Sequence, residues 1–237
     1  MRAMTVRLTR PTLFYGTVLL LLVTFALGIV SYDYFDELDF TLEDQTGPIE
    51  PSGSVSLVIK VAERILEVYD NGQLIKKYRI AVGKSSTPTP IGEWVVVWKD
   101  YNWGSGFGTR WMGLNVPWGT YGIHGTNQPW SIGQFTSHGC IRMRNKDVEE
   151  LFEKVPIGTT VRIEDRRKKV NRVLKYQMTG PDVAILQLKL QSMGYLLSRA
   201  DGIFGRSTED AVKQYQEANG FLSNGIVDKN LAEKLGI

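Results

Sequence analysis

The chain has 237 residues, of which 43% are hydrophobic and 22% are charged, so wholesale disorder is excluded and one or two folded domains are expected. A formal net charge of only +3 gives no reason to expect a nucleic-acid partner. The single cysteine excludes an intramolecular disulfide, and the stability of the fold must therefore come from packing.

The first predicted element is a transmembrane helix at 13–30, a segment of eighteen residues without a charge. A helix of that length spans about 27 Å, close to the ~30 Å hydrocarbon core of a bilayer. The preceding tail, 1–12, carries three arginines and no acidic residue, which predicts a cytoplasmic N-terminus and a single-pass protein whose remaining residues lie outside the cell membrane. The alternative is a cleaved signal peptide and a secreted protein, although "ALG" at 26–28 is a poor cleavage site.

An acidic segment follows at 31–54. It carries seven acidic residues and neither lysine nor arginine, and it ends in the Pro/Gly/Ser-rich stretch "GPIEPSGS". This composition is typical of a solvated stalk, which here would connect the membrane helix to a folded domain.

The next segment, 55–165, is rich in β-branched residues. "RILEVYD" and "QLIKKYRIAV" flank the dipeptide Asn71-Gly72, the strongest short signal for a hairpin with a type I′ turn. The further elements that we expect are strands at 93–98 and 159–164 and a helix at 145–154. The segment therefore predicts a mainly β domain, a mostly antiparallel β-sandwich or open barrel with one helix attached.

Six tryptophans lie between 94 and 130. We expect Trp94 and Trp98 to pack in the core, because both fall in a predicted strand. The other four, in Gly-rich loop sequence, are Trp103, Trp111, Trp118 and Trp130. Loops rarely bury four indoles, so some of these side chains are expected to line a groove, with "GSGFG" as a mobile loop beside it.

The only cysteine, Cys140, lies close in sequence to both histidines of the chain, His124 and His138. Cysteine attacks as the thiolate, and a nearby imidazole is the usual acceptor of its proton. In an extended segment, Cβ atoms two residues apart are about 7 Å apart, too far for a direct hydrogen bond from His138. We therefore expect His124 to be the base, with His138 shaping the pocket. Gly139 removes a side chain beside the sulfur and lets backbone N–H groups approach a substrate carbonyl.

Two other interpretations of Cys140 are open. A free cysteine is often a buried core residue. Two histidines and one cysteine could also hold zinc with one open position, but their spacing matches no zinc signature. The two histidines, the neighbouring glycine and Ser137 favour a thiol nucleophile over both.

The stretch "IHGTNQPWSIGQFTSHGCIRM" resembles the signature of the L,D-transpeptidase (YkuD-like) catalytic domain: a histidine, fourteen to seventeen residues, then [ST]-H-G-C and an apolar residue. The matching positions are His124, Ser137, His138, Gly139, Cys140 and Ile141. Arg142 stands where the pattern often has asparagine. Upstream, "AVGKSSTPTPIGEW" resembles another block of the family, and the resemblance covers roughly 55–164.

This resemblance implies a cysteine-dependent acyltransferase that cross-links peptidoglycan in cell-wall biogenesis, without a cofactor or a metal. The thiolate would attack the carbonyl of the third residue of a tetrapeptide stem, D-alanine would leave, and an amine of a neighbouring stem would resolve the thioester. A carboxypeptidase, exchange of D-amino acids and attachment of other proteins to the wall are alternatives with the same chemistry.

The resemblance also implies roles for individual residues. Cys140 would be the nucleophile and His124 the base, oriented by the backbone carbonyl of Gly125. The oxyanion would be bound by His138, Gly139 and the amide of Cys140. The expected substrate contacts are Arg142, Ser137, Tyr121 and Trp118, of which the arginine could pair with a stem-peptide carboxylate.

The last part of the chain predicts a small all-α domain of three helices at 179–237, after a charged linker at 166–178. Asp182, Ser207 and Asp228 are the expected N-caps of its helices. "DGIFG" and "NGIVD" form an internal half-repeat. The pattern "DVAILQLKLQSMGY…DGIFGRSTEDAVKQYQ…NGIVDKNL" resembles the peptidoglycan-binding domain type 1, which implies that the domain binds the wall polymer and raises the effective substrate concentration.

The expected partners are therefore peptidoglycan stem peptides and glycan and, through the N-terminal helix, the cytoplasmic membrane. We expect a monomer and no nucleic acid. A protein that binds the wall without catalysis is the main alternative function, and the intact His…Ser-His-Gly-Cys pattern favours the enzyme.

Overall fold

The computed structural model describes residues 54–165 and 169–237. The predicted cytoplasmic tail, membrane helix and nearly all of the acidic stalk lie outside the described residues. Within the described ranges, no helix combines the length and apolar character that a bilayer crossing requires.

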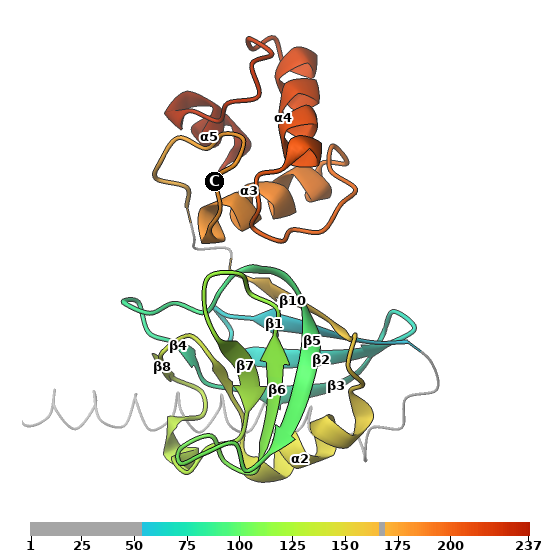
Figure 1. Ribbon diagram of the computed structural model, residues 1–237, viewed down its shortest axis with the longest axis vertical. Coiled ribbons are helices and arrows are strands. Elements are labelled where there is room, and N and C mark those ends of the chain that lie inside the picture. Colours follow the sequence, from blue (N-terminus) through green and yellow to red (C-terminus); the bar gives the residue numbers. More distant parts are fainter. Residues whose placement is uncertain (1–53, 166–168) are drawn as a thin grey trace, which may run out of the picture. The chain divides into compact units, whose positions relative to one another are not determined.

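The first domain is built around a mixed β-sheet (Figure 1). Its strands are β1 (Val55–Lys60), β2 (Ile65–Asp70), β3 (Gln73–Arg79), β4 (Val82–Gly83), β5 (Gly92–Tyr101), β6 (Arg110–Leu114), β7 (Tyr121–His124), β8 (Phe135–Ser137), β9 (Ile141–Arg142) and β10 (Thr160–Glu164). Eight of them form one sheet in the order β3-β2-β1-β10-β5-β6-β7-β9, while β4 and β8 form a parallel pair of their own. Within the large sheet, β1 with β10 and β7 with β9 are parallel pairs and the other neighbours are antiparallel.

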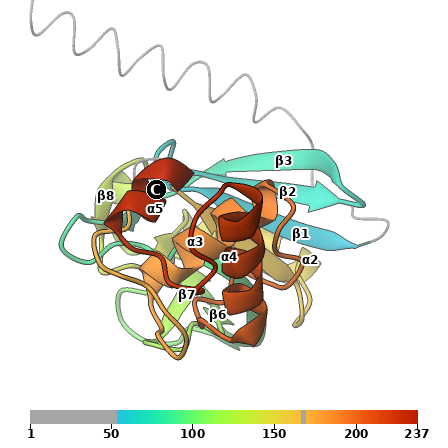
Figure 2. The same ribbon diagram turned by 90° about the horizontal axis from the view of Figure 1, so that it is seen from above.

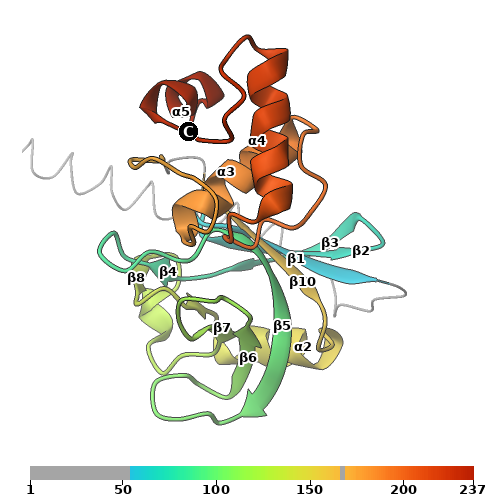
Figure 3. The ribbon, with the colours of Figure 1, turned by 45° about the horizontal axis from the view of Figure 1, so that its top comes forward.

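Strand β5 joins two halves of this sheet. Its first residues pair with β10 and the following ones with β6, and the register shifts between Val96 and Trp98. Such irregularities bend a strand, and Figure 3 shows the curve of β5. Beyond the end of β3, Ala81 forms an antiparallel bridge with Arg142 of β9, so the two edges of the sheet approach each other. The expected mostly antiparallel domain is confirmed, and its form is closer to an open barrel than to two separate sheets.

The predicted hairpin at Asn71-Gly72 is confirmed. β2 and β3 are joined by these two residues alone, whose φ angles are 49° and 79°. Positive φ at both positions is what a type I′ turn requires, and the turn brings β3 back beside β2 (Figure 2). The register of this pair shifts between Val68 and Tyr69. The core beneath includes Leu57, Ile59 and Trp94, each at most 1% exposed.

The predicted helix is α2 (Asn145–Lys154), with the expected bounds. Val148, Leu151 and Phe152 are buried, as their spacing predicts, and the helix packs against β6 and β7. Because α2 follows β9 within three residues, its packing helps to hold β9 beside β7. A single 3₁₀ turn, η1 (Pro129–Ser131), precedes β8.

The second domain has the three predicted helices, α3 (Pro181–Ser192), α4 (Arg206–Ala218) and α5 (Lys229–Leu235). Its core contains Val212, Tyr215, Leu231 and Leu235, which follow helical spacing in their segments. Met193 continues the apolar spacing of α3 but is 41% exposed, at the C-cap of this helix.

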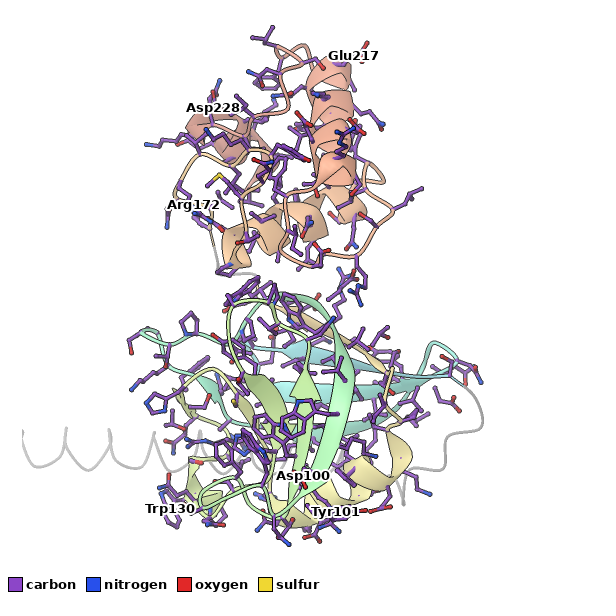
Figure 4. The ribbon with its side chains drawn as sticks, in the orientation of Figure 1. Asp100, Tyr101, Trp130, Arg172, Glu217 and Asp228 are labelled. Carbon is purple, nitrogen blue, oxygen red and sulfur yellow. The ribbon has the colours of Figure 1, made fainter. Side chains whose placement is uncertain are left out.

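One of the three predicted N-caps is confirmed. Asp228 Oδ1 accepts the N–H of Leu231 at 2.8 Å, as a capping carboxylate does. For α3 and α4 the predictions were wrong, since Gly180 and Gly205 occupy the N-cap positions. Asp182 lies inside the first turn of α3 and forms an ion pair with Arg172, which Figure 4 labels together with Asp228.

The half-repeat in sequence corresponds to a repeated contact. Gln187 of α3 accepts the N–H of Gly202 at 2.8 Å and donates to the carbonyl of Ile203 at 3.0 Å. Gln216 of α4 makes the equivalent bonds to Gly225 and Ile226, both at 2.9 Å. Each buried glutamine thus satisfies the backbone of one turn, the first in "DGIFG" and the second in "NGIVD".

Candidate active site

A hollow of about 400 Å³ in the sheet domain contains Cys140 and His124. The residues that line it are Trp103, Ser105, Gly106, Phe107, Trp111, Thr120, His124, Ser137, His138, Cys140 and Arg142. Four segments far apart in sequence therefore form one site: the loop between β5 and β6, strand β6, strand β7 with the residue before it, and the segment from β8 to β9.

The pairing of β7 with β9 brings the cysteine and the histidine together. His124 is in register with Arg142 in this parallel pair, and Cys140 lies two residues before the arginine. Side chains two residues apart on a strand point to the same face, and diagonal neighbours on adjacent strands lie within reach of long side chains. Cys140 directly precedes β9, and both Cys140 and His124 line the hollow.

The turn before Cys140 depends on Gly139 and Ser137. Ser137 Oγ donates to the carbonyl of Cys140 at 2.6 Å and accepts the N–H of Gly139 at 3.1 Å. Gly139 has a φ of 113°, and a Cβ there would lie 2.6 Å from the ring of Tyr121. Both the backbone angle and the space require glycine.

His124 is buried, with 2% of its surface exposed. Its Nδ1 lies 2.5 Å from the carbonyl oxygen of Gly125, so the predicted contact is present. Because a carbonyl only accepts, Nδ1 carries the proton and Nε2 has the free lone pair that a base needs. The ring stacks on Trp111 at a centroid distance of 5.5 Å and meets the edge of Phe107 at 4.9 Å.

Burial determines the protonation states of His124 and Cys140. Burial lowers the pKa of His124 to about 4, and the backbone oxygens of Gly125 and Phe107 oppose this only in part. Burial also raises the pKa of Cys140, against backbone hydrogen bonding by Gly122 and the charge of Arg142. At neutral pH the resting pair is therefore a neutral thiol beside a neutral imidazole.

Arg142 places a positive charge in the hollow. Its backbone N–H and carbonyl are both held by Ala81, at 2.8 and 2.9 Å, so its position is determined by the bridge between the sheet edges. The charge favours the thiolate and disfavours the imidazolium. A guanidinium in this position can also bind a substrate carboxylate.

The remaining predicted site residues divide into two groups. Ser137 and His138 line the hollow. Trp118 is not among the residues that line it and packs edge to face on Trp94 instead, at 5.3 Å. Tyr121 does not line it either, and its ring lies against the backbone of Gly139.

Two details qualify the predicted oxyanion site. The N–H of Gly139 is already used by Ser137, so it does not point into the hollow as a free donor. The exposed His138 is turned toward Lys84, whose Nζ lies 3.5 Å from its Nε2. The backbone N–H of Cys140 is the third predicted donor, and Cys140 itself lines the hollow.

The tryptophan predictions were right in part. Trp94 is in the core, and Trp103 and Trp111 line the hollow, where their ring centroids are 4.1 Å apart. Trp98 is only half-buried and packs on these two rings. Trp130 is 71% exposed and lies at the outer surface, as Figure 4 shows.

Three residues in or beside the site were not predicted from the sequence. Phe107 covers His124, and the only signal for it was an aromatic residue inside the Gly-rich "GSGFG". Thr120 lines the hollow without any signal in its sequence context. Asn145, the first residue of α2, accepts the N–H of Thr126 at 2.9 Å and so supports the loop after His124.

In the ranges 54–165 and 169–237, no three or more histidine, cysteine or acidic side chains converge in a way that could hold a metal ion. The donor set expected for the zinc alternative is not assembled there.

Both domains match known family models. Residues 54–163 match the L,D-transpeptidase catalytic domain (YkuD) and residues 179–235 match a peptidoglycan binding domain (PG_binding_1). The chain is 36% identical over 139 residues to the L,D-transpeptidase relative YqjB of Bacillus subtilis, which covers 52% of this chain and 78% of YqjB. The sheet domain is thus of the L,D-transpeptidase catalytic class. The chain belongs to the L,D-transpeptidase family.

Another relative is YkuD of Bacillus licheniformis, with 49% identity over 107 residues, which is 45% of this chain. The chain spans 64% of the length of this protein and of YkuD from Bacillus subtilis. Among solved structures, the catalytic domain of the Enterococcus faecium L,D-transpeptidase is similar, with 27% identity and a TM-score of 0.41 over 50% of this chain and all of that one.

Proposed function

We propose that the protein is an L,D-transpeptidase that cross-links peptidoglycan through a thioester on Cys140. The observation that carries the proposal is that Cys140, directly before β9, and His124, on the paired strand β7, line one hollow together with Arg142. The family to which the chain belongs supports the same chemistry.

In the first step, the sulfur of Cys140 attacks the carbonyl carbon of the third stem residue while the thiol proton moves to Nε2 of His124. The resting pair is neutral, so this proton moves only as the new C–S bond forms and the negative charge passes to the carbonyl oxygen. The tetrahedral intermediate then collapses, the C–N bond breaks, and His124 returns the proton to the departing D-alanine.

In the second step, an acceptor amine attacks the thioester carbon. The C–N bond forms, the C–S bond breaks, and the amine proton passes through His124 to the released thiolate. The positive charge of Arg142 stabilises the sulfur anion and the developing oxyanion in both steps.

The second domain supports binding of the polymer. It matches a peptidoglycan binding domain over 179–235 and would keep the enzyme on an insoluble substrate. The membrane anchor predicted at 13–30 would hold both domains outside the cytoplasmic membrane, where the wall lies.

The test is mass spectrometry of the purified full-length protein incubated with tetrapeptide-containing muropeptides. We expect a thioester adduct on Cys140, release of D-alanine and a new cross-linked dimer, all lost in Cys140→Ala, with activity reduced about 10³-fold or more. Turnover that survives Cys140→Ala would disprove the thiol mechanism. Release of D-alanine without any cross-link would show a carboxypeptidase instead.

A further inference from the structure

A second hollow, of about 460 Å³, borders the segment between β4 and β5. The residues that line it are Val61, Gly83, Lys84, Ser85, Pro88, Thr89, Phe135 and Asp165. It shares no lining residue with the hollow of Cys140, yet the two are linked by a contact, since Nζ of Lys84 lies 3.5 Å from Nε2 of His138. The mechanism described above assigns no role to this hollow.

Lys84 is held in place by the segment that leads to the cysteine. Its backbone N–H donates to the carbonyl of Ser137 at 3.1 Å, and its own carbonyl accepts the N–H of Thr87 at 3.0 Å, which closes a turn. The hydroxyl of Thr87 donates to the same Ser137 carbonyl at 3.2 Å. The lysine is therefore attached three residues from Cys140 through a direct backbone hydrogen bond.

In the part of the chain that the structure describes, no acidic side chain neutralises the charge of Lys84. Over the ranges 54–165 and 169–237, no carboxylate lies within ion-pair distance of its ammonium group. An ammonium has no lone pair, so in its contact with His138 the imidazole nitrogen must be the acceptor. Asp165, which has interactions of its own, lines the same hollow and disfavours ligands with several negative charges.

We propose that Lys84 is a specificity-determining residue that binds the carboxylate of the acceptor, so that the enzyme selects amines with a carboxylate on the adjacent carbon. This inference rests on the proposed function and names the acceptor class for the second step. A half-buried cation beside a hollow with one acid on its wall suits a single carboxylate better than a phosphate or a neutral amine.

The carboxylate contact also helps the chemistry. An amine must be unprotonated to attack, and a neighbouring carboxylate favours the ammonium form. Pairing that carboxylate with Lys84 removes part of this effect. The amine then attacks the thioester on Cys140 as written above, forming the C–N bond and releasing the sulfur, with no additional reactant.

The experiment compares two acceptors, D-methionine and D-methioninamide, which differ in the carboxylate alone. Full-length wild-type protein is first loaded with a tetrapeptide donor, and products are quantified by mass spectrometry at equal concentrations of unprotonated amine. We expect wild type to prefer the acid about tenfold, as a charge-assisted contact predicts. In Lys84→Ala, the ratio of the rate with D-methionine to the rate with D-methioninamide should fall close to one. Lys84→Arg should keep most of the preference for the acid, and the surface variant Lys146→Ala should show the same ratio as wild type.

The ratio is measured within each variant, so a general loss of activity does not affect it. Equal use of both acceptors by wild type, or an unchanged preference in Lys84→Ala, would overturn the assignment. A wild-type protein that only hydrolyses its thioester would overturn it too. Failure to form any thioester would instead refute the proposed function, and the two failures are therefore distinguishable.

Discussion

Both domains hold a turn with a buried polar side chain, but the sheet domain also assembles a reactive pair. In the helical domain, Gln187 and Gln216 each satisfy the backbone of a turn nine to fifteen residues away. In the sheet domain, Ser137 closes the turn before Cys140 locally, but the base comes from β7 and its aromatic cover from the β5–β6 loop. One buried side chain can therefore hold a turn, whereas the reactive pair of Cys140 and His124 depends on the pairing of β7 with β9.

The domains also differ in what their buried polar groups do. Each glutamine finds partners for both ends of its amide, so burial costs little. His124 stacks on Trp111 and packs against Phe107, and burial shifts the pKa of both His124 and Cys140 away from the charged form. The buried glutamines of the helical domain stabilise its turns. In the sheet domain, burial keeps His124 and Cys140 uncharged at neutral pH.

The largest effect in this comparison is expected for Gly139→Ala. The added Cβ meets the ring of Tyr121 at 2.6 Å and the backbone has a φ of 113°, so the turn that presents Cys140 must move. We expect acylation to fall about 100-fold, because small displacements in an active site have effects of that size. Mass spectrometry of the thioester adduct measures the loss.

Gly158→Ala is the matched control. Its φ is 94°, but an added Cβ there has no neighbour within 4 Å. It should cost about 1 kcal/mol of stability and leave acylation as in wild type. Equal acylation by both variants would show that the turn before Cys140 tolerates a side chain.

The next effect is a pH dependence of stability that comes from His124. Its pKa is about 4 in the folded protein, below its ordinary 6.5, so between these values the unfolded chain binds a proton that the folded chain does not. The stability is complete above pH 6.5 and falls by on the order of 3 kcal/mol as the pH drops to 4. His124→Gln should remove this loss, whereas the exposed His138→Gln should retain it.

Tryptophan fluorescence during urea unfolding measures this change in the sheet domain alone, because all six tryptophans lie between 94 and 130. Unfolding midpoints at pH 7 and pH 4.5 give the difference for each variant. If wild type and His124→Gln lose the same stability on acidification, the imidazole is not buried as described.

The smallest effect is expected for Gln216→Ala. The N–H of Gly225 and the carbonyl of Ile226 lose their partner, which costs about 2 kcal/mol. The helical signal in circular dichroism should melt earlier, while the tryptophan transition of the sheet domain stays where it is. Lys229→Ala, at an exposed site of α5, serves as the control. A simultaneous shift of both transitions would show that the domains do not unfold independently.

Much of the fold was predictable because its signals are local. The hairpin at Asn71-Gly72 follows from residues that accept positive φ, and α2 follows from apolar residues at helical spacing. The caps of α3 and α4 were misplaced by two residues, because an acidic residue or serine in the first turn and one at the N-cap look alike in sequence.

The sequence by itself determined the chemistry: one thiol, two imidazoles and a glycine beside the nucleophile, in a pattern that resembles the L,D-transpeptidases. Only the tertiary structure decided which groups surround them. The pairing of β7 with β9 brings His124 into the hollow of Cys140, and the Gly-rich loop places Phe107 over the ring. Likewise, the turn at Lys84 meets His138 only after folding. These contacts join residues 16 to 54 positions apart, and such distant pairing is governed by burial of the whole sheet rather than by any local pattern.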